Sequence, residues 1–368
     1  MAFGLVQTAE VVIIMSIINR YIARTVIVYI LLALLLIIGV DLLFAFVREL
    51  KYTGNANYTV LDIIHYLILT IPRRIYNMFP MASLLGTVIG LGLLASHSEL
   101  IIMRASGISF TQLAGSLVRV ALILAVVNTA IGEWVVPKTQ PAAEVLRAAA
   151  RGKTQAMLTA EGAWIKNQNT FIHIDRMYPG GHMQGIIRYS FTPDGHLQSA
   201  SYSRDAFYEG DSWTLHDTDY SIIDNNSVKT SHTKEEQWES NVSPNLLNVL
   251  ISSPDDLSIS GLVQYISYLK NNSLNAESYL LAFWRKIVQP FTTMVMIVLA
   301  LTFIMSSVRN HAIGLRIVIG VVAGFAFYVL NQLFGPLSIV YNFPPLLAAL
   351  MPTALFALLA AWLLRRVF

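Results

Sequence analysis

Residues that often carry out chemistry are present in this chain, but their spacing fits no enzyme active site. Gly152-Lys153-Thr154 is similar to the end of a phosphate-binding loop, yet Arg147 stands where that loop requires its first glycine. The close pairing typical of metal ligands is missing among the histidines of the polar middle of the chain, which are His173, His182, His196, His216 and His232. No Ser-His-Asp, paired-carboxylate or H-E-x-x-H arrangement stands out. We therefore predict no catalytic residue, no metal site and no cofactor bound by this chain, so a separate subunit must power any work against a gradient.

A set of basic residues stands beside long apolar segments. A single arginine or lysine in such a place usually anchors a helix end at the lipid headgroups. A cluster suits phosphate recognition better, because guanidinium and ammonium groups form charge-assisted hydrogen bonds to phosphate oxygens. The set consists of Arg48, Lys51, Arg73, Arg74, Arg285 and Lys286. We predict that the first four bind the phosphates of an anionic lipid.

Three polar residues interrupt the apolar segments themselves: Asp41, Asn331 and Gln332. A polar side chain inside a bilayer is costly unless it faces protein or a water-filled cavity. We expect these three side chains to line a cavity.

A short stretch from His97 to Gly107 is expected to form two helical turns between the second and third apolar segments. Its apolar residues Leu100, Ile101 and Met103 need a surface to contact, and Gly107 is a C-terminal stop signal. That surface is either a partner protein or the lipid headgroups, and the residues alone favour neither. Glu99 suits an arginine of a partner better than it suits anionic lipid.

The elements that position these residues are membrane spans. Hydrophobic residues make up 55% of the chain and charged residues only 13%, which excludes a protein that is soluble throughout. A spanning helix needs about 20 mostly apolar residues. Pro72 and Pro80 are expected to break or kink the second of the qualifying segments. These segments are 26–47, 60–94, 118–136, 287–305, 313–333 and 346–364.

The basic residues nearest the spans set the orientation. Positive residues accumulate on the cytoplasmic side of a membrane. That side carries Arg20, Arg24, Arg104, Arg119, Arg309, Arg316, Arg365 and Arg366. Both termini are then cytoplasmic and the polar middle is periplasmic. We expect residues 1–16 to be an N-terminal extension, with Met15 as the natural start.

The polar middle is predicted to be an all-β domain. Alternating runs such as Phe171-Ile172-His173-Ile174 indicate strands, and Pro193-Asp194-Gly195 indicates a turn. An antiparallel sandwich or jelly roll over residues 138–257 follows, and it needs its own core because the chain has no cysteine. After it, Ser260 is predicted to cap an amphipathic helix on the membrane surface within 258–277. The fold class is therefore membrane α-helical, with six transmembrane helices and an inserted periplasmic jelly roll.

Several strings resemble one family over the chain from about Ile17 to the C-terminus. They are Ser98-Glu99-Leu100 with Ala105-Ser106-Gly107, Ile131-Gly132-Glu133-Trp134-Val135-Val136-Pro137, Leu257-Ser258-Ile259-Ser260-Gly261-Leu262 and Phe334-Gly335-Pro336-Leu337. They are similar to the LptF/LptG permeases, and the second and third are similar to the LptG branch. The resemblance implies a permease that extracts lipopolysaccharide from the periplasmic leaflet of the inner membrane and passes it to a periplasmic bridge toward the outer membrane.

The same resemblance implies partners and roles. The partners would be an LptF-like permease, an LptB-like ATPase dimer that uses ATP and Mg, an LptC-like single-helix protein and, indirectly, an LptA-like bridge, with no nucleic acid. A coupling helix at 97–107 would seat in the ATPase through Glu99, Leu100, Met103, Arg104, Ala105 and Gly107. Lys51 and Arg73 match family positions that meet lipid A phosphates, whereas Ala45 replaces a family lysine.

Two other classes of function compete with this interpretation. A membrane-anchored structural or sensory protein would use its β domain only to bind an envelope partner. An intramembrane hydrolase would need a nucleophile and a base within the spans, and the sequence offers no persuasive pair. Copurification with a nucleotide-hydrolysing dimer separates an exporter from a sensor.

Overall fold

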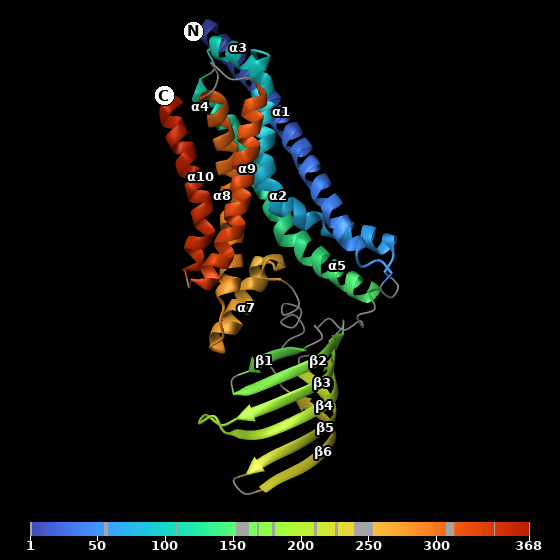
Figure 1. The fold of residues 1–368 in the computed structure, drawn as a ribbon. Coiled ribbons are helices and arrows are strands. Elements are labelled where there is room, and N and C mark those ends of the chain that lie inside the picture. The colour runs from blue at the N-terminus through green and yellow to red at the C-terminus, as the bar shows by residue number, and fades with distance from the viewer. Residues whose placement is uncertain are drawn as a thin grey trace. The chain divides into compact units, whose positions relative to one another are not determined.

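A computed structural model describes most of the chain (Figure 1). The described residues are 2–54, 58–107, 109–151, 162–167, 169–178, 181–209, 212–224, 227–238, 253–306, 313–341 and 343–367, with the side chains of 2–16 left aside. Gly152-Lys153-Thr154 lies outside them.

Within these residues, six helical segments are long and apolar enough to cross a membrane. The prediction of six membrane helices is thereby confirmed. The helices that form them are α1 (Ala2–Leu50), α2 (Val60–Ser96), α4 (Phe110–Ala130) with its continuation, α8 (Glu277–Ser306), α9 (Ile313–Val340) and α10 (Pro345–Val367).

The second helix contains both prolines that were expected to break or kink it. Neither Pro72 nor Pro80 ends α2, which runs from Val60 to Ser96 as one element. Neither proline therefore breaks the helix, and a kink at either one stays a prediction. Tertiary packing can hold a helix together across a missing backbone donor.

The third membrane segment is longer than predicted. After α4 the backbone continues as the π-helix η1 (Ile131–Val135) and then as α5 (Val136–Ala150). The predicted start of the β domain at residue 138 stays a prediction; among the described residues the first strand, β1, begins at Ala163. The alanines of the last turns of α5 have the highest helix propensity, which explains the extension.

The middle of the chain forms a six-stranded antiparallel sheet, which confirms an inserted β domain (Figure 1). Its strands follow one another in sequence order, each paired with the next. The jelly roll remains a prediction, because its second sheet is not among these strands and residues 239–252 lie outside the described part. The strands are β1 (Ala163–Asn167), β2 (Thr170–Tyr178), β3 (His182–Phe191), β4 (Leu197–Glu209), β5 (Ser212–Asp224) and β6 (Ser227–Trp238).

One face of the sheet buries an apolar core that needs no disulfide. Ile172, Ile174 and Trp213 are fully buried in it. Complete burial of an isoleucine side chain such as Ile172 or Ile174 contributes about 1.5–3 kcal/mol. The sheet thus has the core that a cysteine-free domain requires.

Helix α7 (Ile259–Asn271) follows the sheet after the short 3-10 turn η2 (Pro254–Asp256). Its N-cap is Ser258, whose Oγ accepts a hydrogen bond from the Gly261 N–H at 3.1 Å, so the prediction of Ser260 as the cap is wrong. Its apolar face is buried against the chain itself, and Tyr268 donates to the Lys166 carbonyl of β1 at 2.7 Å. This face is therefore occupied by protein contacts.

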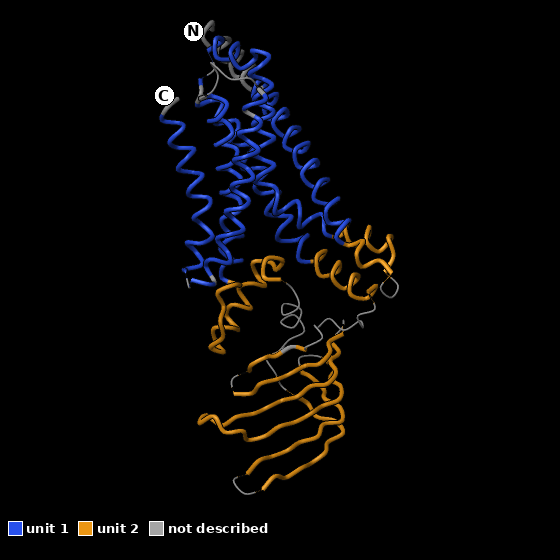
Figure 2. The backbone as a smooth tube through the Cα atoms, viewed as in Figure 1, with its two compact units in different colours: residues 1–48, 70–137, 280–368 blue, residues 49–69, 138–279 orange. Residues whose placement is uncertain are grey.

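The chain divides into two compact units (Figure 2). Unit 1 comprises residues 1–48, 70–137 and 280–368, and unit 2 comprises 49–69 and 138–279. In unit 1 small residues let helices approach closely: a Cβ on Gly86 would lie 2.3 Å from Ile30 Cα, and one on Gly324 would lie 3.1 Å from Met81 Cγ. Gly86 and Gly324 therefore mark close helix contacts within this chain.

Candidate functional site

The predicted docking helix is α3 (Glu99–Ala105) in unit 1. It begins after Ser98, a non-glycine residue with φ 61°, and is followed by Gly107 with φ 93°. The Gly107 N–H donates to the Arg104 carbonyl at 3.1 Å. Both ends of α3 therefore turn sharply, which isolates it as a short separate element between α2 and α4.

The exposed side chains of α3 differ from those predicted. Leu100 is buried in the core of unit 1 and Met103 packs partly against that core, so these two hold α3 in place. Ile101 and Ile102 are the large apolar side chains exposed on α3, together with Arg104 and Ala105. Ile102 was missed because the sequence alone did not fix the rotation of so short a helix.

Glu99 opens α3 and remains accessible. Its side chain is 33% exposed and accepts a hydrogen bond from the Tyr21 hydroxyl at 2.9 Å, while His97 Nδ1 lies 4.0 Å away. A neutral hydroxyl and a distant imidazole leave much of the negative charge uncompensated. The first turn of α3 thus presents a carboxylate that is able to pair with a cation of another protein.

Two predicted site residues are joined to each other. Arg74, predicted to bind phosphate, forms an ion pair with Asp41, predicted to line a cavity, and also donates through Nε to Thr70 Oγ1 at 3.2 Å. A cation that already holds a carboxylate has less to offer an external phosphate. Arg48 and Lys51 are both exposed, and Arg73 is partly exposed.

The other two polar residues predicted to line a cavity have different environments. The backbone carbonyl of Asn331 accepts a hydrogen bond from Arg285 Nη2 at 2.8 Å, which ties α9 to α8. Gln332 is exposed on the surface of unit 1. Asn331 therefore contributes a helix contact through its backbone.

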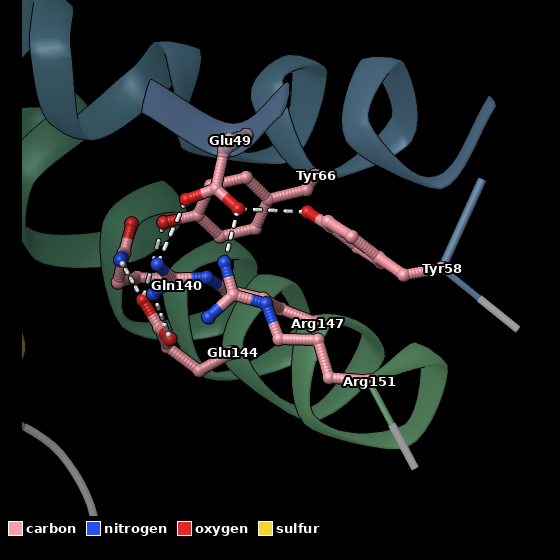
Figure 3. A network of polar contacts seen from close by, with 7 residues as sticks. All are labelled: Glu49, Tyr58, Tyr66, Gln140, Glu144, Arg147 and Arg151. Carbon is pink, nitrogen blue, oxygen red and sulfur yellow. Dashed lines mark hydrogen bonds and ion pairs between the residues drawn. The ribbon is translucent and has the colours of Figure 1, made fainter. Parts of the chain in front are cut away.

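A polar network that was not predicted lies in unit 2 around Glu49 (Figure 3). The Glu49 side chain is only 7% exposed and forms ion pairs with both Arg147, at 2.8 Å, and Arg151. The Tyr58 hydroxyl donates to the same carboxylate at 2.9 Å. One buried carboxylate thus serves two guanidinium groups and a phenol.

Further contacts surround the two arginines. Glu144 accepts from Arg147 at 3.4 Å and from Gln140 at 3.2 Å, both on α5 (Figure 3). The Arg147 guanidinium lies 5.1 Å from the centre of the Tyr66 ring, and that of Arg151 lies 3.8 Å from the centre of the Tyr52 ring. Cation–π contacts of this kind keep the arginines fixed without neutralising them.

The buried position of Tyr58 raises the pKa of its phenol to about 12, first because burial disfavours the phenolate and second because the hydroxyl donates to the Glu49 carboxylate. Tyr58 therefore remains a hydrogen-bond donor at neutral pH.

Comparison of the sequence with known proteins shows which family the chain belongs to. A model of the family described as "Lipopolysaccharide export system permease LptF/LptG" matches residues 20–366. The chain belongs to the LptF/LptG family. It is 38% identical to lipopolysaccharide export system permease protein LptG of Escherichia coli K12 over 354 residues, covering 95% of this chain and 98% of that protein. It is 36% identical over 350 residues to the protein of the same name from Haemophilus influenzae, with 95% and 98% covered.

In this member of the LptF/LptG family, the string from Ile131 to Pro137 includes the π-helix η1. Lys286, a side chain that is 6% exposed, donates to the Gly132 carbonyl at 2.7 Å and lies 3.8 Å from the Glu133 carboxylate. A Cβ on Gly132 would lie 2.3 Å from Tyr76 Cε2, so only glycine fits. Lys286 therefore holds a backbone turn instead of facing a lipid phosphate.

Proposed function

We propose that this protein is a permease subunit of an ABC exporter that extracts lipopolysaccharide from the periplasmic leaflet of the inner membrane and passes it to a periplasmic bridge toward the outer membrane. Membership of the LptF/LptG family and the two LptG relatives carry the proposal. The six apolar helices and the inserted sheet fit a multi-pass subunit of this kind.

The protein takes its driving force from a separate ATPase dimer that binds α3. Glu99 forms an ion pair with an arginine of that ATPase, and the exposed side chains of Ile101 and Ile102 fill an apolar groove beside it. Leu100, buried in unit 1, transmits the movement of α3 to the helices packed around it. A short helix anchored by one buried residue and exposed on its other side suits this role.

The lipid phosphates are guided by cations that are exposed or partly exposed. Arg48 in the last turn of α1 and Lys51 just after α1 are exposed, and Arg73 on α2 is partly exposed. Arg74 contributes less to phosphate binding, because it already forms an ion pair with Asp41.

The arrangement in the envelope follows from charge. The basic residues beside α3 and near the chain ends support an orientation with both termini in the cytoplasm and the sheet in the periplasm. The partners are then an LptF-like permease and an LptC-like single-helix protein in the membrane, an LptB-like ATPase below, and an LptA-like bridge beyond the sheet.

Purification of the intact complex tests this function. A tagged chain extracted in mild detergent is expected to carry a second permease, an ATPase dimer and bound lipopolysaccharide, identified by mass spectrometry. A Glu209→Arg variant, altered on β4 at an exposed site, should carry the same partners. Recovery of the chain without any nucleotide-hydrolysing subunit and without phosphorylated lipid would instead support a structural or sensory envelope protein.

A further inference from the structure

The carboxylate of Glu49 occupies the place of a bound anion. It lies between the guanidinium groups of Arg147, in the last turn of α5, and Arg151, which directly follows α5 (Figure 3). Each guanidinium group also lies against an aromatic ring. Two cations aimed at one small acceptor form the usual geometry of a phosphate site. Here the acceptor belongs to the chain itself.

The Glu49 carboxylate does not use all the hydrogen-bond donors of this network. Glu49 Oε1 accepts from Arg147, while Oε2 accepts from both Arg151 and Tyr58. The Nε groups of both arginines are buried and have no hydrogen-bond partner among the described residues. A phosphate has three strong acceptor oxygens where a carboxylate has two, so it satisfies more of these donors.

Glu49 is also close in sequence to two exposed cations. Arg48 and Lys51 stand on either side of Glu49 in the sequence. Both side chains are exposed to solvent, whereas Glu49 is buried. The Arg147 and Arg151 side chains keep 27% and 16% of their surface exposed. An anion attracted by the exposed cations is therefore able to bind the Arg147–Arg151 pair once the Glu49 carboxylate moves away.

We propose that Glu49 is a built-in competitor for the phosphate group of the transported lipid: it occupies the Arg147–Arg151 pair when no lipid is bound, and the lipid phosphate displaces it. This inference rests on the proposed function. It makes Glu49 a residue that sets the affinity for phosphorylated lipid and allows release, since the returning carboxylate replaces the departing phosphate without leaving two buried cations unpaired.

A purely structural role makes the opposite prediction. If Glu49 only fastens the end of α1 to α5, its removal lowers stability and leaves lipid binding unchanged or weaker. If it competes with phosphate, its removal strengthens binding, and only for lipids that carry phosphate.

The experiment measures binding of bisphosphorylated and dephosphorylated lipid A to the purified complex in nanodiscs. Glu49→Gln should bind the bisphosphorylated lipid about tenfold more tightly than the unaltered complex, the size expected for one charge-assisted contact. Binding of the dephosphorylated lipid should not change. In Glu49→Gln/Arg151→Gln the gain should disappear, because the second guanidinium is gone.

Glu144→Gln is the matched control. It makes the same change in the same network, but its side chain is 47% exposed and does not contact Arg151. We expect it to change the affinity less than threefold, in keeping with an exposed ion pair. If Glu49→Gln does not fold, Glu49→Asp takes its place in the test. Its shorter side chain retains the charge but bridges both arginines poorly. It should therefore show a smaller increase in affinity for the bisphosphorylated lipid.

The outcomes separate the two proposals. An unaltered complex that binds neither form of lipid A overturns the proposed function. An unaltered complex that binds the bisphosphorylated lipid, combined with folded Glu49→Gln or Glu49→Asp variants that show no gain, overturns only the competitor role. A gain that persists without Arg151 overturns it as well.

Discussion

Two glutamates of this chain, Glu99 and Glu49, have the same side chain and opposite environments. Glu99 starts an exposed helix and has a tyrosine hydroxyl and a distant histidine beside it, with a third of its side chain exposed. Glu49 is buried and is shared by two arginines and a tyrosine. The first carboxylate is available to another protein, whereas the second is already neutralised inside the chain.

This difference shows which of the two carboxylates is able to bind another protein. An exposed ion pair within one chain contributes little to stability, but a carboxylate left open is able to select a partner by charge. A buried carboxylate between two cations is costly to remove, because it leaves the cations unpaired. We therefore expect changes at Glu99 to affect assembly and changes at Glu49 to affect stability and lipid binding.

The largest expected effect is that of reversing the charge at Glu99. Glu99→Arg should weaken binding of the ATPase about a hundredfold, because like charges facing each other across an interface cost several kcal/mol. The amount of ATPase retained by the purified membrane subunits measures this. Glu209→Arg is the control, and equal retention in both variants would show that α3 does not carry the ATPase contact.

The next effect separates the two glutamates by stability. Glu49→Ala should lower the free energy of unfolding by about 3 kcal/mol, whereas Glu99→Ala should lower it by less than about 1 kcal/mol. Thermal unfolding of the purified complex in detergent measures both. Equal losses would mean that burial does not distinguish the two carboxylates.

A smaller effect concerns the end of the Glu99 helix. Gly107→Ala should cost about 1 kcal/mol, because φ 93° is unfavourable for alanine although no atom lies within 4 Å of the added Cβ. Gly39→Ala in α1 is the matched control, since its Cβ also meets no atom within 4 Å and its backbone is helical. A loss of the same size at both positions would remove backbone strain as the cause.

The smallest effect is a pH dependence next to Glu49. The pKa of Tyr58 is raised to about 12, so its contribution to stability is full below pH 10, the ordinary value, and is lost as the pH rises toward 12. The unaltered protein should therefore lose more stability than Tyr58→Phe between pH 10 and 12. Parallel melting curves for the two proteins over that range would contradict the buried hydrogen bond.

The sequence predicted the membrane helices and the strands because both depend on local patterns of apolar residues. It did not predict the partners of the charged residues, since Glu49 and Arg147 are 98 positions apart and Asp41 and Arg74 are 33 apart. Such pairs form only when helices pack. Four-residue spacing between Arg147 and Arg151, which puts both on one helix face, was the available signal for the network.

The end of the third membrane helix was misplaced for a similar reason. Composition becomes polar after Pro137, and this was taken as the end of the helix, but α5 continues to Ala150. Helix propensity in an alanine-rich run, rather than hydropathy, determines that boundary. The rotation of α3 was likewise beyond a local pattern, since burial of Leu100 against other helices decides it.

Lipopolysaccharide release from proteoliposomes tests the central claim most directly. The membrane subunits are reconstituted with lipopolysaccharide, and transfer to a soluble periplasmic acceptor is followed with and without the ATPase subunit. We predict ATP-dependent transfer with the unaltered chain and ATPase together, and none when either the ATPase is omitted or Glu99 is replaced by arginine. Transfer at the same rate without the ATPase would contradict the account.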